Sequence, residues 1–287
     1  MRLTLQDPRL RDTAEAVGRL VREAGGRVLW VGGCVRDALL GLPVTDVDLE
    51  VYGVAPDRLR ERLGARFPLD LVGKAFGVLK LRGLPVDVSL PRRESKAGLG
   101  HKGFAVQSDP GLAPEAAARR RDFTINAMAY DPETETLIDP VGGLRDLRNR
   151  VLRHVSGAFA EDPLRVLRGM QFVARFDLAP APETVALCRR MTPEGLPGER
   201  LFEEWRKLLV KGRAIGAGLA FLQAAGWTRY VPELAVLIGC EQEPEWHPEG
   251  DVWTHTRHCL DAFARERLGD PEEDLVVGFG VLCHDFG

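Results

Sequence analysis

The sequence lacks the features that would place it in a membrane, a secretion route or a fibrous assembly. No apolar run among its 287 residues approaches the roughly 20 residues that a membrane-spanning helix needs. The charged start, MRLTLQDPRLRDT, is unlike a secretory signal. Its five cysteines form no CxxC pair, which disfavours a disulfide scaffold or a structural zinc site and favours a reducing cytoplasm.

A strong overall charge is absent too, since the net charge is −3, so composition alone does not indicate a nucleic-acid-binding protein. Individual segments differ from this overall balance of charge. Between Pro140 and Phe176 there are seven arginines and only three acidic residues. A second basic cluster covers 92–102 and 119–121. Each cluster is either a solvated helix face or a nucleic-acid contact.

Apolar periodicity and Gly or Pro breaks predict a mixed α/β unit followed by a helical region. The length fits two domains, or one core with satellites. Residues 91–112 have no periodicity and are predicted to form a mobile loop, whose length favours a function. The expected strands are 27–31, 46–53, 76–81 and 85–90, and the expected helices are 7–24, 33–41, 56–64, 115–130, 143–149, 161–176, 182–191, 199–211 and 214–226, with two more in 252–287.

Asp46 and Asp48 form a DxD pair on the predicted strand 46–53. Side chains two residues apart on a strand point to the same face, so the two carboxylates would repel each other unless a cation lies between them. Mg²⁺ binds a few carboxylates together with substrate phosphates. Asp87 on a later strand supplies a third carboxylate, which is the arrangement that two-metal phosphoryl transfer requires. A turn or surface role is the alternative for a DxD pair by itself.

Gly32 and Gly33 precede a predicted helix that contains Arg36. Glycines let the backbone approach a phosphate, the start of a helix attracts anions, and Arg36 can bind triphosphate oxygens. A tight turn is the structural alternative. The pattern is neither GxGxxG nor GxxxxGK[ST], which disfavours a dinucleotide-binding fold and a P-loop enzyme.

Two later segments combine arginine and aspartate at helical spacing. RRRDFTINAMAYD (119–131) contains Arg121, Asp122 and Asn126, and a capped helix is its structural explanation. EDPLRVLRGMQFVARF (161–176) places Asp162 and Arg165, followed by Arg168, along one predicted helix side. Such a pair is either a salt bridge or an acceptor and donor set for the pairing edge of a base.

Taken in order, these motifs resemble the bacterial class II tRNA nucleotidyltransferases, a family that includes CCA-adding enzymes, A-adding enzymes and poly(A) polymerases. The resemblance covers roughly 27–240 and rests on VGGCVRDALLG, DVDLEVYG, VDVSLPR, RRDFTINAMAYD, IDPVGGLRDLRNRVLRHV, EDPLRVLRGMQFVARF and GERLFEEWRKLL. It implies an α+β fold, with a polymerase-β-like nucleotidyltransferase head followed by a helical neck, body and tail. The expected domains are a head at 1–138, a neck at 139–212, a body at 213–250 and the start of an HD domain at 251–287.

The resemblance also implies a role for individual residues. Asp46 and Asp48 match the carboxylates that hold the catalytic metal, with two Mg²⁺ ions expected. Gln171 departs from the family, where many members have arginine. The expected nucleotide-binding residues are Gly33 and Arg36 at the triphosphate, Arg121 and Asp122 near the ribose and phosphate, Asp162 and Arg165 as the protein template for the base, and also Asn126 and Arg168. Glu199 and Arg200 are expected to support the template helix. Residues 91–104 match the mobile loop implicated in the switch from CTP to ATP.

The implied activity is addition of CCA, from CTP and ATP, to tRNA 3′ ends in the cytoplasm. Addition of A alone and poly(A) polymerisation are alternatives within the family, and an HD-type phosphohydrolase or a non-catalytic RNA-binding module are alternatives from other classes. HD domains bind metal through a His, a His-Asp pair and a later Asp. His255, His284 and Asp285 match the first three of these, so we expect an incomplete site without hydrolase activity in this chain.

Overall fold

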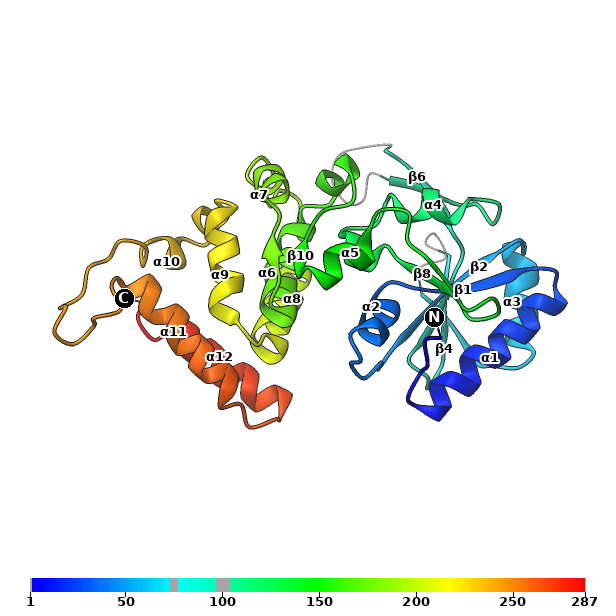
Figure 1. Ribbon diagram of the computed structural model, residues 1–287, viewed down its shortest axis with the longest axis horizontal. Coiled ribbons are helices and arrows are strands. Elements are labelled where there is room, and N and C mark those ends of the chain that lie inside the picture. The colour runs from blue at the N-terminus through cyan, green and yellow to red at the C-terminus, as the bar shows by residue number, and fades with distance from the viewer. Residues whose placement is uncertain (1, 73–76, 97–103, 287) are drawn as a thin grey trace. The chain divides into compact units, whose positions relative to one another are not determined.

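The computed structural model describes residues 2–72, 77–96 and 104–286 (Figure 1). Within these ranges the chain folds into two compact units. The first comprises Met1–Arg148 with His154–Ala158, and the second comprises Asn149–Arg153 with Phe159–Gly287. No helix in the described part is both long and apolar enough to cross a lipid bilayer.

A mixed sheet forms the centre of the first unit. Its strand order is β3-β4-β5-β2-β1-β8-β9, in which β2 and β5 run parallel and the other neighbours run antiparallel. The β-branched and aromatic content of these segments suits strands that are buried on a sheet. The strands are β1 (Arg27–Val31), β2 (Val47–Tyr52), β3 (Leu69–Val72), β4 (Val78–Leu81), β5 (Val86–Ser89), β8 (Ala129–Asp131) and β9 (Thr136–Ile138).

Helix α1 (Pro8–Glu23) packs on β1, β2 and β5 and contacts α3 (Pro56–Gly64). The Asp7 carboxylate caps α1 by accepting from the Arg9 N–H at 2.7 Å, and Pro8 occupies the first turn, where its missing N–H costs nothing. The remaining helices of this unit are short. They are α2 (Gly33–Leu39), α4 (Pro114–Ala118), the 3-10 helix η2 (Thr124–Asn126) and α5 (Gly143–Arg148).

The predicted helix at 115–130 is wrong. α4 ends at Ala118, and the chain then passes through η2 into β8, which lies between β1 and the edge strand β9. All three residues of β8 are buried, so it has no alternation of polar and apolar residues that would distinguish it from a buried helix. The strands β3 and β9 were not predicted for a related reason, since each has only three or four residues.

The predicted loop at 91–112 is also partly wrong. Strands β6 (Arg92–Lys96) and β7 (Phe104–Ser108) form an antiparallel ribbon with Arg92 opposite Ser108. Residues 97–103 lie outside the described residues. Pairing between the two strands satisfies backbone groups, which requires no apolar pattern in the side chains.

The second unit is helical apart from a two-residue parallel pairing of β10 (Val151–Leu152) with β11 (Ala179–Pro180). Helix α6 packs against α8 and α9, while α11 packs against α9 and α12. A Cβ added at Gly218 of α9 would lie 2.7 Å from the Met170 carbonyl oxygen, so glycine permits this close approach to α6. The helices are η3 (Gly157–Glu161), α6 (Leu164–Phe176), α7 (Pro182–Cys188), α8 (Gly198–Lys211), α9 (Ile215–Ala224), η4 (Thr228–Tyr230), α10 (Pro232–Ala235), α11 (Val252–Arg265) and α12 (Pro271–Cys283).

Candidate functional site

The sheet register brings the predicted carboxylates of the first unit together. Asp48 on β2 lies opposite Val31, the last residue of β1, and beside Asp87 on the parallel strand β5. Side chains in register on neighbouring strands project from the same face, so Asp48 and Asp87 share a face. Asp46 is exposed immediately before β2, two residues from Asp48. These three residues are the ones that the sequence singled out as candidate metal ligands.

The electrostatics of this group fit a bound cation. Burial raises the pKa of Asp48 to about 6, with the charges of Asp46 and Asp87 contributing to the rise and those of Arg121 and Lys80 opposing it. Lys80 on β4 already neutralises Asp87, with Nζ 2.7 Å from Oδ2. A cation bound at Asp48 would relieve the remaining repulsion, because opposite charge favours an ionised carboxylate.

The glycine turn lies directly against this group. Gly32 has a φ of +74°, which disfavours any residue with a Cβ. A Cβ built there would lie 3.2 Å from Arg121 Nη1 and 3.5 Å from Asp48 Oδ2. The backbone at Gly32 therefore reaches the carboxylate and the arginine together, and Gly33 begins α2 at the same point.

We expect Gly32→Ala to impair activity much more than stability. The left-handed backbone costs a non-glycine residue about 1–2 kcal/mol, and the methyl group would crowd Arg121 Nη1 and Asp48 Oδ2. The measurements are a thermal melt and the activity that the sequence resemblance implies, nucleotide incorporation, at saturating tRNA. Gly41→Ala is the matched control, since Gly41 has a φ of +68° and no atom within 4 Å of an added Cβ. Equal activity losses in both variants would contradict the role of the Gly32 turn.

Arg36 is buried, with only 4% of its surface exposed. Its guanidinium donates through Nε to Asp37 Oδ1 at 2.8 Å and through Nη1 to Asn126 Oδ1 at 2.6 Å. Asn126 Nδ2 in turn donates to Asp122 Oδ1 at 3.2 Å. This network ties α2 to η2, so Arg36, Asn126 and Asp122 act together in fixing the turn; their contact with a nucleotide stays a prediction.

Glu50 is a site residue that the sequence reasoning missed. It is buried on β2, where its Oε2 accepts a hydrogen bond from the Tyr52 hydroxyl and its Oε1 lies 3.5 Å from Arg121 Nη2. Glu50 thus holds Arg121 beside Asp48. The signal was present in DVDLE, since Asp46, Asp48 and Glu50 alternate and project from the same strand face.

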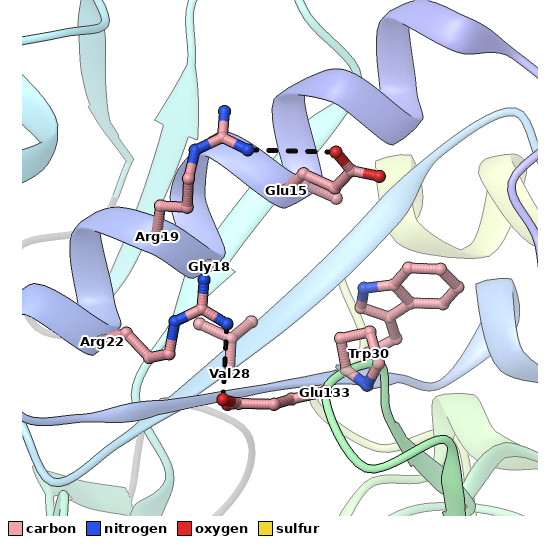
Figure 2. A pocket seen from close by; sticks show the side chains of 9 residues that line it. Glu15, Gly18, Arg19, Arg22, Val28, Trp30 and Glu133 are labelled. Carbon is pink, nitrogen blue, oxygen red and sulfur yellow. Dashed lines mark ion pairs between the residues drawn. The ribbon is translucent and has the colours of Figure 1, made fainter.

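A pocket of about 260 Å³ lies on the opposite face of this sheet, between α1 and β1 (Figure 2). Trp30 forms part of its wall. The arginines on α1 that line it are paired, Arg19 with Glu15 at 3.9 Å and Arg22 with Glu133 at 3.4 Å. Since Trp30 alternates with Val31, this pocket is separate from the carboxylate face.

In the second unit, Asp162 lies ahead of α6 rather than on it. Helix α6 begins at Leu164, and Asp162 Oδ1 accepts from the Leu164 N–H at 3.1 Å. Its other oxygen, Oδ2, lies 2.9 Å from Arg200 Nη2 on α8. The prediction that Asp162 shares a helix face with Arg165 is therefore wrong in its geometry. The two residues are joined by a turn, in which the Arg165 N–H donates to the Asp162 carbonyl at 3.1 Å.

The arginines of α6 lie over aromatic rings. The Arg165 guanidinium carbon is 6.0 Å from the Phe159 ring centroid, and that of Arg168 is 5.2 Å from the Phe172 ring centroid. An aromatic ring at this distance attracts the charge of a guanidinium group and restrains its position. Gln171 is buried, and its Oε1 accepts a hydrogen bond from Arg175 Nη1 at 3.2 Å. Its side chain therefore makes a contact within the second unit.

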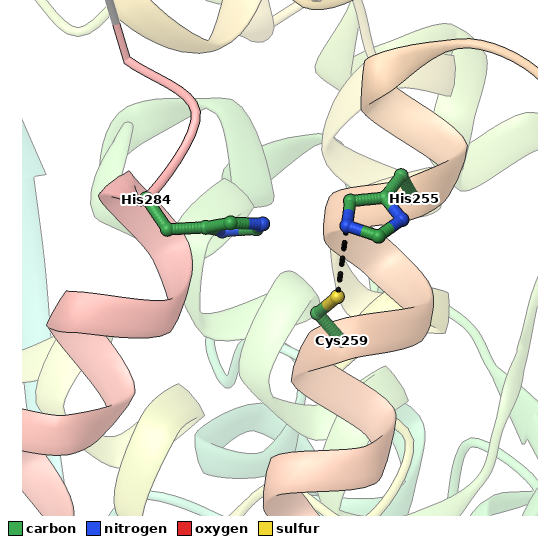
Figure 3. A group of neighbouring side chains, drawn as sticks. All are labelled: His255, Cys259 and His284. Atoms are coloured by element: carbon green, nitrogen blue, oxygen red, sulfur yellow. Dashed lines mark hydrogen bonds between the residues drawn. The ribbon is translucent and has the colours of Figure 1, made fainter. Parts of the chain in front are cut away.

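The HD-like residues also converge within the second unit. His255 on α11 and His284 after α12 (Figure 3) have ring centroids 5.4 Å apart, and His284 Nε2 lies 3.2 Å from Asp285 Oδ2. Glu249 Oε1 lies 2.6 Å from His255 Nδ1. The hydrogen bond with His255 is the main reason that the pKa of Glu249 falls to about 2, with His247 contributing in the same direction.

The chain is similar to known proteins along most of its length. Residues 28–153 match the family model described as "Poly A polymerase head domain". The "Multifunctional CCA protein" of Stenotrophomonas maltophilia (strain K279a) is 41% identical over 268 residues, which make up 91% of this chain. The chain spans only 64% of that relative's length.

Solved structures show the same fold. The Thermotoga maritima CCA-adding enzyme complexed with tRNA superposes with a TM-score of 0.69 at 25% identity, covering 99% of this chain and 64% of that one. The Bacillus stearothermophilus CCA-adding enzyme in complex with CTP gives 0.69 at 26% identity, with coverage of 97% and 70%. A CCA-adding enzyme in complex with ATP gives 0.66 at 26% identity, with coverage of 98% and 63%. The predicted α+β architecture, a mixed sheet followed by helices, is thereby confirmed.

Proposed function

Because the chain is similar to CCA-adding enzymes along most of its length, we propose that it belongs to the bacterial class II family and is a tRNA nucleotidyltransferase that uses CTP and ATP to build the CCA end of tRNA. The observation that supports this most is the group formed by Asp46, Asp48 and the Gly32 turn, with Arg121 held beside it. Carboxylates next to a backbone turn and an arginine suit a nucleoside triphosphate with its metal.

In the proposed reaction, the tRNA 3′-hydroxyl oxygen attacks the α-phosphorus of the nucleotide, the bond to the β-phosphate oxygen breaks, and pyrophosphate leaves. Asp46 and Asp48 would hold Mg²⁺, which lowers the pKa of the hydroxyl and offsets the charge of the leaving group. Arg121, positioned by Glu50, would bind phosphate oxygens. The Gly32 turn allows the triphosphate to approach the backbone closely.

We assign base selection to Asp162 and Arg165. A carboxylate accepts from the amino group that cytosine and adenine share, and an arginine donates to the neighbouring ring nitrogen. The arginine-rich region 140–176 is the proposed contact with the tRNA backbone, so binding should weaken with salt. The neck, body and HD-like divisions at 139–212, 213–250 and 251–287 remain proposals, as does a reducing cytoplasmic location, which the five free cysteines favour.

The test is an assay with three tRNAs that end before the first C, after C and after CC, each with CTP, ATP or both. A CCA-adding enzyme should extend all three and stop at CCA. Extension only of the tRNA ending in CC would indicate A addition, and an untemplated run of A would indicate a poly(A) polymerase. No incorporation on any tRNA in Mg²⁺ would overturn the proposed function.

A further inference from the structure

We propose that Glu50 and Tyr52 are positioning residues that keep Arg121 away from the Asp48 carboxylate, so that Asp48 stays open to a metal ion. The inference rests on the proposed function, in which Asp48 is a ligand of Mg²⁺. An arginine and a metal ion compete for one carboxylate, because each of them neutralises its charge. A site that contains both must therefore hold the arginine to one side.

Arg121 lies beside Asp48 but pairs with a different carboxylate. A Cβ built on Gly32 would lie 3.2 Å from Arg121 Nη1 and 3.5 Å from Asp48 Oδ2, so both groups border the same small space. Within the part of the chain that the structure describes, Arg121 makes one ion pair, in which its Nη2 is 3.5 Å from Glu50 Oε1. Glu50 thus supplies the counter-charge that Asp48 would otherwise supply.

The Tyr52 hydroxyl fixes the orientation of Glu50 by donating to its other oxygen, Oε2. Side chains two residues apart on a strand project from the same face, so Asp48, Glu50 and Tyr52 follow one another along β2. The hydroxyl has little freedom, because the Tyr52 ring is buried in a core cluster. The other buried members of this cluster are Leu29, Val31 and Ala129.

Burial separates the roles of the two carboxylates. Glu50 is buried, with only 11% of its side chain exposed, whereas Asp48 is partly buried. A hydrated metal ion can reach Asp48 more easily than Glu50. An ion pair with little contact with water is also screened less by salt than an exposed one. Glu50 is therefore suited to hold the arginine, and Asp48 to bind the metal.

The central test is Glu50→Gln, which removes the counter-charge of Arg121 and changes the side-chain volume little. The guanidinium should then turn to Asp48, the carboxylate beside it, and occupy the oxygen that the metal needs. We expect metal affinity to fall about 10-fold, because hydrogen bonds between charged groups are stronger than those between neutral groups.

Tyr52→Phe is a milder change, since it keeps the buried ring and removes only the hydroxyl. It should weaken metal binding about threefold, in proportion to one neutral hydrogen bond. Tyr130→Phe is the matched control. The Tyr130 hydroxyl is buried on β8 of the same sheet and accepts from the Leu3 N–H at 3.2 Å. Its loss should leave metal affinity unchanged.

Metal binding is measured directly with Mn²⁺, which shares the preference of Mg²⁺ for oxygen ligands and whose free form is quantified by electron paramagnetic resonance. The complete 287-residue chain is used without nucleotide or tRNA, and Asp48→Ala identifies the Mn²⁺ bound at the proposed site. A double-mutant cycle with Arg121→Met separates a positioning role from a structural one. Glu50→Gln should weaken Mn²⁺ binding when Arg121 is present and have little effect when it is methionine.

Two results would overturn the inference. One is unchanged Mn²⁺ affinity in Glu50→Gln when circular dichroism shows the variant to be folded. The other is an equal loss of affinity with and without Arg121. If Glu50→Gln does not fold, Tyr52→Phe in the same cycle decides the question. Mn²⁺ binding that does not depend on Asp48 would refute the proposed metal site and this inference with it. A chain that binds Mn²⁺ as expected but extends no tRNA contradicts only the proposed function.

Discussion

Asp46→Ala and Asp48→Ala should each lower the rate of nucleotide incorporation about a thousandfold or more while tRNA binding persists. The two carboxylates are the proposed Mg²⁺ ligands, and charge stabilisation by a metal contributes several kcal/mol to such a transition state. The arginine-rich region 140–176 that is proposed to bind tRNA remains unchanged. Incorporation is measured as single-nucleotide extension in Mg²⁺, and tRNA binding by a filter or gel-shift assay.

Stability separates a lost ligand from a lost fold. Burial, Asp46 and Asp87 raise the pKa of Asp48, so its ionised form is disfavoured in the folded chain. An acid with a raised pKa destabilises the fold at pH values above that pKa, and removing its charge should leave the melting temperature unchanged or higher at pH 7 without metal. Asp57→Ala is the control, because this carboxylate is exposed on α3. Wild-type turnover by either site variant would refute the metal assignment.

Local signals were strong enough to predict the first half of the sheet. The Gly-Gly turn, the alternation in 46–53 and the Pro56 helix start are short-range features, and β1, α2, β2 and α3 follow them closely. The sequence also predicts that Asp48 and Asp87 lie on two strands of one sheet. Their direct register depends on β5 pairing parallel to β2, a long-range choice that local pattern does not determine.

The features that were missed all depend on tertiary contacts. β8 is too short and too buried to have a period of its own. Glu50 acquires its role only when Arg121, 71 residues later, comes within 3.5 Å. Sequence spacing predicts neighbours on one element, whereas these neighbours come from different elements.

Asp162 should determine which bases the chain accepts, and the structure shows how to separate that role from a structural one. The carboxylate accepts from the Leu164 N–H and pairs with Arg200, so Asp162→Ala would remove a hydrogen bond to the first residue of α6 and an ion pair together with any template function. Asp162→Asn is the sharper change. The asparagine Oδ1 can still accept from the Leu164 N–H, yet its amide presents a donor as well as an acceptor.

A template role therefore predicts that Asp162→Asn accepts UTP and GTP more readily, because the amide can donate to the carbonyl that these bases present. Each mispaired group costs on the order of 1–3 kcal/mol, so the preference for CTP and ATP over UTP and GTP should fall by roughly 5- to 150-fold. The readout is competition among all four triphosphates on a tRNA lacking CCA, beside a thermal melt.

Arg200→Ala provides the matched comparison, since it breaks the same ion pair and leaves the Asp162 carboxylate in place. If Asp162 reads the base, Arg200→Ala should change nucleotide preference much less than Asp162→Asn does, although both variants lose part of the pair with α8. If Asp162 only joins α6 to α8, both variants should melt at similarly lowered temperatures and select CTP and ATP as before. Unchanged selectivity in Asp162→Asn would thus reduce Asp162 to a structural residue, and base selection would then have to depend on Arg165 and the residues around it.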